Sequence, residues 1–153
     1  MAYALTSDKP FDIIIYGATG FTGQLVAEYF HSYYANSSVK WAIAGRSAEK
    51  LAQIKQTLAL PDDLPMLVAD SHDEDALREL VTQTRVVITT VGPYQLYGDT
   101  LVSLCAELGT DYVDLCGEPS WMRQKIDALS DMAHDSGARI VFSCGFDSIP
   151  FDL

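Results

Sequence analysis

The stretch FDIIIYGATGFTG, residues 11–23, decides the fold of this chain. Its first half is an apolar run with the length of a buried strand, and GATGFTG follows directly. Three glycines at this spacing, between a predicted strand and a predicted helix, indicate a loop that lets a ligand approach the backbone. Gly17 permits the tight turn off the strand, Gly20 leaves room for a pyrophosphate, and Gly23 allows close packing of helix against strand.

Strand and helix patterns alternate along the rest of the chain, without repeats or low-complexity segments. Six segments are predicted as strands because they are short, apolar and bounded by turn residues: 11–17, 39–45, 65–70, 85–92, 111–117 and 139–145. Five helices are predicted between them. We therefore expect a doubly wound parallel α/β sheet of the Rossmann type, with right-handed crossovers that place helices on both faces.

Apolar positions at helical spacing predict which side of each helix packs inward. In the first helix the apolar residues on one face are Phe21, Leu25, Val26, Tyr29, Phe30 and Tyr33. The corresponding inner residues of the second helix are Leu51, Ile54 and Leu58, and those of the last helix are Ile126, Leu129, Met132 and Ala133.

Polar and glycine residues at helix ends predict where the helices begin and stop. Ser47 is expected to cap the second helix, and Ser71 with Glu74 forms a capping-box pattern before the third. Gly109 and Gly137 are expected to end the fourth and fifth helices.

The glycine loop occupies the switch point beside the first strand, where sheets of this class bind their ligands. Backbone amides at a helix N-terminus attract phosphate groups. The predicted phosphate-binding residues form one continuous segment: Gly17, Ala18, Thr19, Gly20, Phe21, Thr22 and Gly23.

The end of the second predicted strand selects the cofactor. An NAD-binding fold usually carries an acidic residue here, whereas this chain has Arg46 and Ser47. Arg46 can pair with a 2′-phosphate, helped by Ser47 and Lys50, so the sequence predicts NADP(H) in preference to NAD(H). Asp70, at the end of the third strand, either accepts from the adenine amine or caps the next helix.

The loop after the fourth strand is expected to hold the nicotinamide end. Val91, Gly92, Pro93 and Tyr94 are its predicted cofactor-binding residues, and Tyr94 and Tyr97 either line the pocket or pack on neighbours. Glu118, after the fifth strand, either orients a substrate or starts the next helix. The sequence assigns no acid–base residue and no metal site.

Composition excludes several other classes of protein. The net charge is −11, from 21 acidic and 10 basic residues, which argues against nucleic acid as a partner. We find neither a transmembrane-length apolar run nor the features of a signal peptide in MAYALTSDKP, so a cytoplasmic location is expected. Cys105, Cys116 and Cys144 lack metal-ligand spacing, and a reduced state is predicted.

Three other kinds of nicotinamide-binding protein share features with this sequence. Short-chain dehydrogenases use a Tyr-x-x-x-Lys pair, which is missing here. Semialdehyde and acyl-phosphate reductases attack with a cysteine, and Cys144 is the candidate. A redox-sensing module that holds NADP(H) without turnover is the third alternative. His31, His72 and His134 are expected to be structural.

Five segments in order, GATGFTG, AGRS, TTVGPYQLYG, YVDLCGE and GFDSIPFDL, resemble the saccharopine dehydrogenase-like oxidoreductases, a family that includes trans-acting enoyl reductases of lipid biosynthesis. The resemblance implies an NADP-binding N-terminal domain, with Gly17 to Gly23, Arg46 and Val91 to Tyr94 on the cofactor. It implies hydride transfer to or from a carbonyl, imine or enoyl substrate, which some members receive in lipid-linked form, and peripheral membrane contact in some members.

Members of this family are considerably longer than 153 residues. We therefore expect residues 1–153 to be the cofactor domain of a longer protein. A substrate domain, through which a homodimer would form, is expected beyond Leu153. The chain alone is expected to be inactive.

Overall fold

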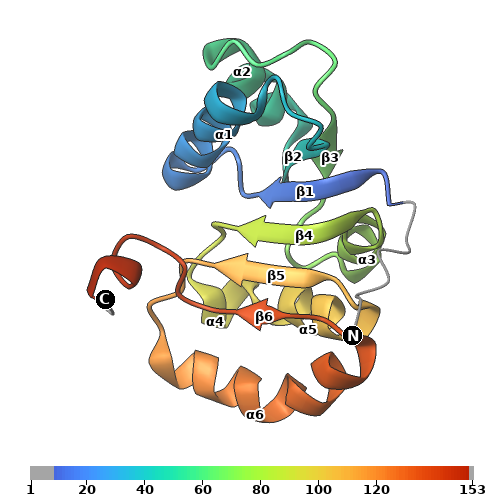
Figure 1. Ribbon diagram of the computed structural model, residues 1–153, viewed down its shortest axis with the longest axis vertical. Coiled ribbons are helices and arrows are strands. Elements are labelled where there is room, and N and C mark those ends of the chain that lie inside the picture. The colour runs from blue at the N-terminus through green and yellow to red at the C-terminus, as the bar shows by residue number, and fades with distance from the viewer. Residues whose placement is uncertain (1–8, 152–153) are drawn as a thin grey trace.

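The computed structural model describes residues 9–151, which contain one sheet of six strands (Figure 1). The strands are β1 (Phe11–Tyr16), β2 (Trp41–Gly45), β3 (Met66–Val68), β4 (Thr84–Thr89), β5 (Asp111–Asp114) and β6 (Ile140–Val141). Their order is β3-β2-β1-β4-β5-β6, and every neighbouring pair is parallel. The chain thus runs outward from β1 to one edge and returns to β4, so the strand order reverses between β1 and β4.

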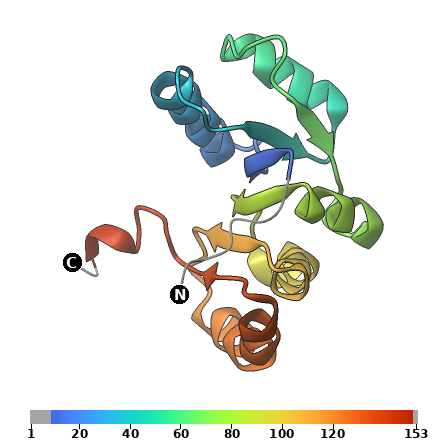
Figure 2. The same cartoon turned by 45° about the vertical axis from the view of Figure 1, so that its right-hand side comes forward.

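Helices cover the two faces of this sheet in two groups. α1 (Phe21–Tyr34) and α2 (Ala48–Thr57) lie on one face, and α3 (Glu74–Thr82), α5 (Asp99–Leu108) and α6 (Pro119–Ser136) lie on the other (Figures 1 and 2). A short helix α4 (Tyr94–Tyr97) follows β4, and a 3-10 turn η1 (Ile149–Phe151) comes last. The predicted doubly wound α/β fold is confirmed.

Two hydrophobic cores result from the alternation of side chains along the strands. In β1, Ile14 and Tyr16 point toward α3 and α5, whereas Ile15 points toward α1 and α2. All three are buried, as expected for a parallel strand covered on both faces.

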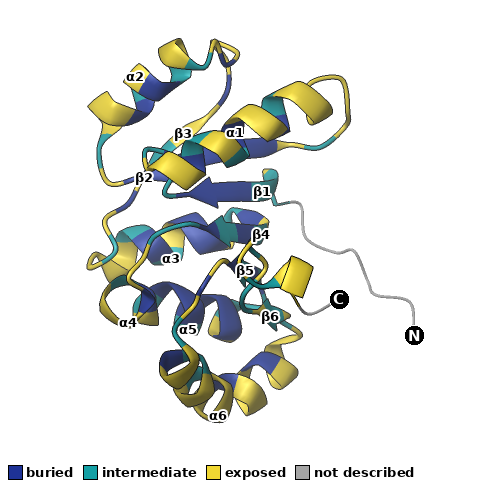
Figure 3. Cartoon of the chain, turned by 90° about the vertical axis from the view of Figure 1, so that its left-hand side faces the viewer, coloured by how far each residue is buried: buried dark blue, intermediate teal, exposed yellow. Residues whose placement is uncertain are grey.

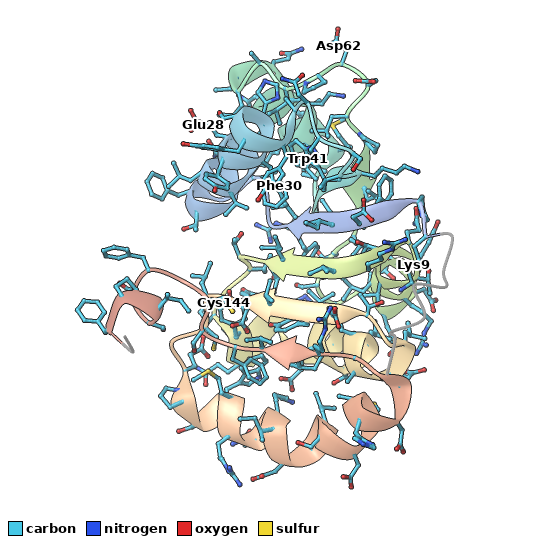
Figure 4. All side chains as sticks on the ribbon, in the orientation of Figure 1. Lys9, Glu28, Phe30, Trp41, Asp62 and Cys144 are labelled. Atoms are coloured by element: carbon cyan, nitrogen blue, oxygen red, sulfur yellow. The ribbon has the colours of Figure 1, made fainter. Side chains whose placement is uncertain are left out.

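The apolar face predicted for α1 is largely wrong. Phe21 is 82% exposed and Tyr33 71% exposed, and Figure 3 shows an exposed stripe along this helix. The buried residues are Gly23, Ala27 and Phe30. The ring of Phe30 packs against that of Trp41, with 5.6 Å between the ring centroids (Figure 4). Gly23 and Ala27 determine which side of α1 faces the sheet, because these small residues let the helix lie closer to the sheet than larger side chains would.

The predicted helix ends are mostly confirmed. Ser47 caps α2 through its side chain, and Gly109 and Gly137 end α5 and α6 in the left-handed conformation. The capping box was wrong, because the residue that caps α3 is Asp73, whose carboxylate accepts from the amide of Ala76 at 3.0 Å.

Other local patterns were only partly right. In α2, Leu51 and Ile54 are buried as predicted. In α6, Leu129 and Ala133 are buried, whereas Ile126 and Met132 are more than 40% exposed. The sixth strand is shorter than the pattern indicated.

No helix among residues 9–151 is long and apolar enough to span a membrane. Residues 1–8, on which most of the leader-peptide interpretation rests, and the last two residues of the GFDSIPFDL motif lie outside the described residues.

Candidate dinucleotide-binding site

The glycine loop follows β1 and contacts the ends of β2 and β4, at the point where the strand order reverses. Gly17 follows β1 with a φ of +93°, and its amide donates to the carbonyl of Ala44 in β2 at 2.9 Å. A Cβ at this position would lie 2.7 Å from both Thr90 Oγ1 and Val91 Cγ2 beyond β4. Glycine is therefore required here by both the backbone conformation and the lack of space.

Gly20 is different, because the fold leaves room for a side chain there. It precedes α1 with a φ of −80°, and a Cβ would meet only the carbonyl oxygen of Gly17, at 3.4 Å. No side chain caps α1 in the described part of the chain. The free amides and the positive end of the helix dipole therefore face an open space beside Gly20, which suits an anionic group.

Side chains hold this loop from both sides. Gln24 Nε2 donates to the carbonyl of Thr19 at 3.2 Å, and Thr90 Oγ1 donates to that of Gly17 at 3.2 Å. These hydrogen bonds tie the loop to α1 and to the residue that follows β4.

A cavity of about 270 Å³ opens above the carboxyl ends of β1, β2 and β4. It is lined by Tyr16, Gly17, Thr19, Gly20, Gly45, Arg46, Ser71, Thr90, Val91, Gly92 and Tyr97. The structure therefore brings together six of the predicted cofactor residues, from the first glycine loop, the end of β2 and the loop after β4.

Four predicted residues of the glycine segment do not line this cavity. Ala18 is fully buried beneath the loop, and Gly23 packs against Gly17. The side chains of Phe21 and Thr22 are exposed on the first turn of α1. These residues shape the loop or flank it, and their direct contact with a cofactor stays a prediction.

Of the three residues predicted to bind the cofactor at or after the end of β2, Arg46 lines the cavity, whereas Ser47 and Lys50 do not. Ser47 Oγ accepts from the amide of Lys50 at 3.3 Å as the cap of α2, and Lys50 is exposed outside the cavity lining. Asp70 is also outside the lining, and its carboxylate accepts from the amide of His72 at 2.9 Å. That hydrogen bond holds the pKa of Asp70 below its usual value. The predicted role of Asp70 as the cap of the next helix is wrong, because Asp73 caps α3, and the contact of Asp70 with adenine stays a prediction.

In the loop after β4, Val91 and Gly92 line the cavity, whereas Pro93 and Tyr94 do not. Tyr94 is buried, with its hydroxyl donating to the carbonyl of Thr89 at 3.1 Å and accepting from the amide of Leu115 at 3.3 Å. Burial raises the pKa of this phenol above its ordinary value. Tyr94 is therefore a structural anchor, and of the two tyrosines in this loop segment Tyr97 is the one that lines the cavity.

Four lining residues were missed by the sequence analysis: Tyr16, Gly45, Ser71 and Thr90. Tyr16 and Gly45 end their strands, and Thr90 and Ser71 come shortly after theirs. The rule that ligands bind beyond the carboxyl ends of parallel strands, applied to every strand, would have found them.

These features define a class. A parallel sheet with reversed order, a glycine loop before an uncapped helix and a cavity over that loop make a Rossmann-type dinucleotide-binding domain. Residues 13–141 match the family model described as the saccharopine dehydrogenase NADP binding domain. The chain belongs to this family, and its cofactor is NADP(H), as the sequence predicts.

Relatives and solved structures agree with this assignment. The chain is 46% identical over 149 residues to trans-acting enoyl reductases from Mycobacterium bovis and Mycobacterium tuberculosis, covering 96% of this chain and 35% of theirs. A homologue from Mycobacterium ulcerans is 45% identical over 149 residues, covering 97% of this chain and 35% of the homologue. The chain thus spans about a third of the length of the relatives it matches.

The fold is similar to that of apo saccharopine dehydrogenase (L-Glu forming) from Saccharomyces cerevisiae. The TM-score is 0.71 at 17% identity, over 90% of this chain and 28% of that one. A complex of leucoanthocyanidin reductase with NADPH from Vitis vinifera has a TM-score of 0.59 at 19% identity, over 86% of this chain and 48% of that one.

Proposed function

We propose that this chain is the cofactor domain of an NADP(H)-dependent oxidoreductase of the saccharopine dehydrogenase-like type. Residues 1–153 hold the dinucleotide, and a separate domain beyond Leu153 supplies the substrate wall and any homodimer contact. The greater length of the relatives supports this division. We propose a cytoplasmic location for the protein, together with the peripheral membrane contact that the family resemblance implies for some members.

The observation that carries the proposal is the space beside Gly20. The fold itself accommodates a Cβ at this position, so the open space beside the uncapped start of α1 fits a ligand phosphate. Arg46 lines the same cavity and provides the planar cation that pairs with a 2′-phosphate.

When NADPH is bound, it supplies the hydride, and the residues of this chain bind and orient it. The amides of the glycine loop hold the pyrophosphate and Arg46 holds the 2′-phosphate. The backbone at Val91 and Gly92 forms the wall on the nicotinamide side. The names of the relatives favour an enoyl substrate, in free or lipid-linked form, over a carbonyl or imine.

The cysteine-dependent alternative receives no support from the site. Cys144 is exposed and does not line the cavity over the glycine loop. Partial desolvation raises the pKa of its thiol, which disfavours the nucleophilic thiolate. Cys144 Sγ instead lies 3.7 Å from the carbonyl oxygen of Val141. The alternative of a redox sensor differs from an enzyme only in turnover, so kinetics must separate them.

NADPH absorbance provides the test, with enoyl and carbonyl substrates and with residues 1–153 and the full-length protein in parallel. We expect both forms to bind NADPH, and steady oxidation only by the full-length protein with an enoyl substrate. Binding without turnover by both would favour the sensor, and equal turnover by both would place all catalytic groups within residues 1–153.

A further inference from the structure

Glu118 starts α6, as one of its two predicted roles has it, but its side chain makes contacts that neither role describes. It precedes α6, yet its carboxylate reaches back to the start of α4, 24 residues earlier. Oε1 accepts from the amide of Tyr94 at 2.7 Å, and Oε2 accepts from the amide of Gln95 at 3.0 Å. A carboxylate that accepts two amides at a helix start satisfies donors that the helix itself cannot, and the charge strengthens both bonds.

The position of α4 sets the position of the cavity wall. Only Pro93 separates the first residue of α4 from Val91 and Gly92, which line the cavity. The Pro93 carbonyl also accepts from the amide of Tyr97 at 3.1 Å, so loop and helix move together. A side chain that holds α4 therefore holds the wall.

Glu118 itself projects from an anchored loop. Asp114 Oδ1 accepts from the amide of Cys116 at 3.0 Å, and its other oxygen accepts from the Tyr112 hydroxyl at 2.8 Å. The amide of Glu118 donates to Cys116 Sγ at 3.4 Å. The backbone of Glu118 is thus attached to a hydrogen-bond network of Cys116, Asp114 and Tyr112, and Glu118 does not line the cavity.

The sheet order shows which half of the cofactor this wall faces. Arg46 ends β2, on one side of β1, whereas Val91 and Gly92 follow β4 on the other side. With the pyrophosphate over the β1 loop and the 2′-phosphate at Arg46, the nicotinamide half lies over β4.

We infer that Glu118 is a positioning residue for the nicotinamide half of NADP(H), acting through α4 on the backbone of Val91 and Gly92. This inference rests on NADP(H) binding and does not depend on which reaction the protein catalyses. Glu118 does not line the cavity, so it would act on the cofactor through α4.

A variant without this carboxylate should still fold, because a second tie joins the same loops. The Tyr94 hydroxyl bonds to both Thr89 and Leu115, and those bonds do not involve Glu118. Removing Glu118 should loosen the wall while α4 stays attached.

The test compares two ligands by calorimetric titration of the wild type, Glu118→Ala and Glu118→Gln. One ligand is NADPH, and the other is adenosine 2′,5′-bisphosphate, which carries the adenine end and the 2′-phosphate but no nicotinamide. We expect Glu118→Ala to weaken NADPH binding about tenfold and the bisphosphate less than twofold, given the modest strength of charged hydrogen bonds. Glu118→Gln should weaken NADPH binding by less than Glu118→Ala does. Its side-chain oxygen can still accept one hydrogen bond, but its NH2 group would face the second backbone N–H.

Asp99→Asn is the matched control. Asp99 also joins two helices through a carboxylate, with Trp121 Nε1 at 2.6 Å and Lys125 Nζ at 2.9 Å, and it does not line the cavity. This variant should bind both ligands as the wild type does.

Equal weakening of both ligands by the Glu118 variants would overturn the inference, as would unchanged affinity for both. If Glu118→Ala does not fold, the affinities of Glu118→Gln for NADPH and for the bisphosphate provide the same test. A wild-type protein that binds neither ligand would contradict cofactor binding itself.

Discussion

Gly23 lies against Gly17 so closely that a Cβ on Gly23 would be 2.1 Å from the carbonyl oxygen of Gly17. This contact places the first turn of α1 directly on the turn that leaves β1. It separates two kinds of glycine in one motif, since Gly23 is required by packing whereas Gly20 has room for a side chain.

Substituting these two glycines should therefore give opposite results. Gly20→Val should leave the melting temperature within a few degrees of wild type but abolish measurable NADPH binding, because its branches occupy the space for the pyrophosphate. Gly23→Val should destabilise the fold by more than about 3 kcal/mol, since backbone atoms block its Cβ. Thermal unfolding and calorimetric titration of both variants provide the check. Normal NADPH binding by a folded Gly20→Val protein would show that the loop does not hold phosphate.

Arg46 is expected to determine the choice between the two nicotinamide cofactors. The wild type should bind NADPH at least about tenfold more tightly than NADH, because one charged hydrogen bond contributes about 1.5 to 3 kcal/mol. Arg46→Ala should lose most of this preference, with little change in NADH affinity. Calorimetric titrations of the wild type and of Arg46→Ala with NADPH and NADH measure this preference. Retained discrimination in the variant would assign the 2′-phosphate to another residue.

The two sides of α1 should respond differently to truncation. Phe30→Ala should destabilise the protein by about 3 to 4 kcal/mol, because this ring packs on Trp41 in the core. Tyr33→Ala should cost no more than about 0.5 kcal/mol, because Tyr33 is largely exposed. Urea denaturation curves give both values. Equal losses would mean that the exposed stripe of α1 is packed in solution.

Asp99 should make stability depend on pH in the acidic range. Burial pushes the pKa of this carboxyl upward, but hydrogen bonds from Lys125 and Trp121 outweigh it and hold the pKa below its ordinary value. A lowered pKa in the folded state stabilises the protein above about pH 5, and this contribution is lost as the pH falls through the folded-state pKa.

Asp99→Asn should therefore be less stable than wild type at pH 7, by about 0.5 to 1 kcal/mol because the pair is partly exposed to solvent. The difference should vanish by about pH 2, where the wild-type carboxyl is protonated too. Denaturation at a series of pH values measures both limits. A difference independent of pH would mean that the charge of Asp99 contributes nothing.

The sequence by itself determined the features that depend on residues close together in the chain. Alternating apolar runs and helical spacings predicted the parallel sheet, because each strand buried on both faces needs a continuous apolar run. Ser47, Gly109 and Gly137 were predicted as helix ends, because caps and left-handed turns involve only neighbouring backbone. Gly17 and Arg46 were predicted from their places at strand ends.

Only the tertiary structure decided the features that depend on distant partners. The buried side of α1 was set by the approach of Gly23 to Gly17 and by the Trp41 ring, so the larger apolar residues at 21 and 33 stayed outside. Likewise, the sequence around Glu118 predicts a helix start. Its side-chain partners on α4 are 23 and 24 residues away in the chain, and they come within reach only because β4 and β5 pair side by side. Periodicity shows which residues share a face of a helix, but the space available against the sheet decides which face is buried.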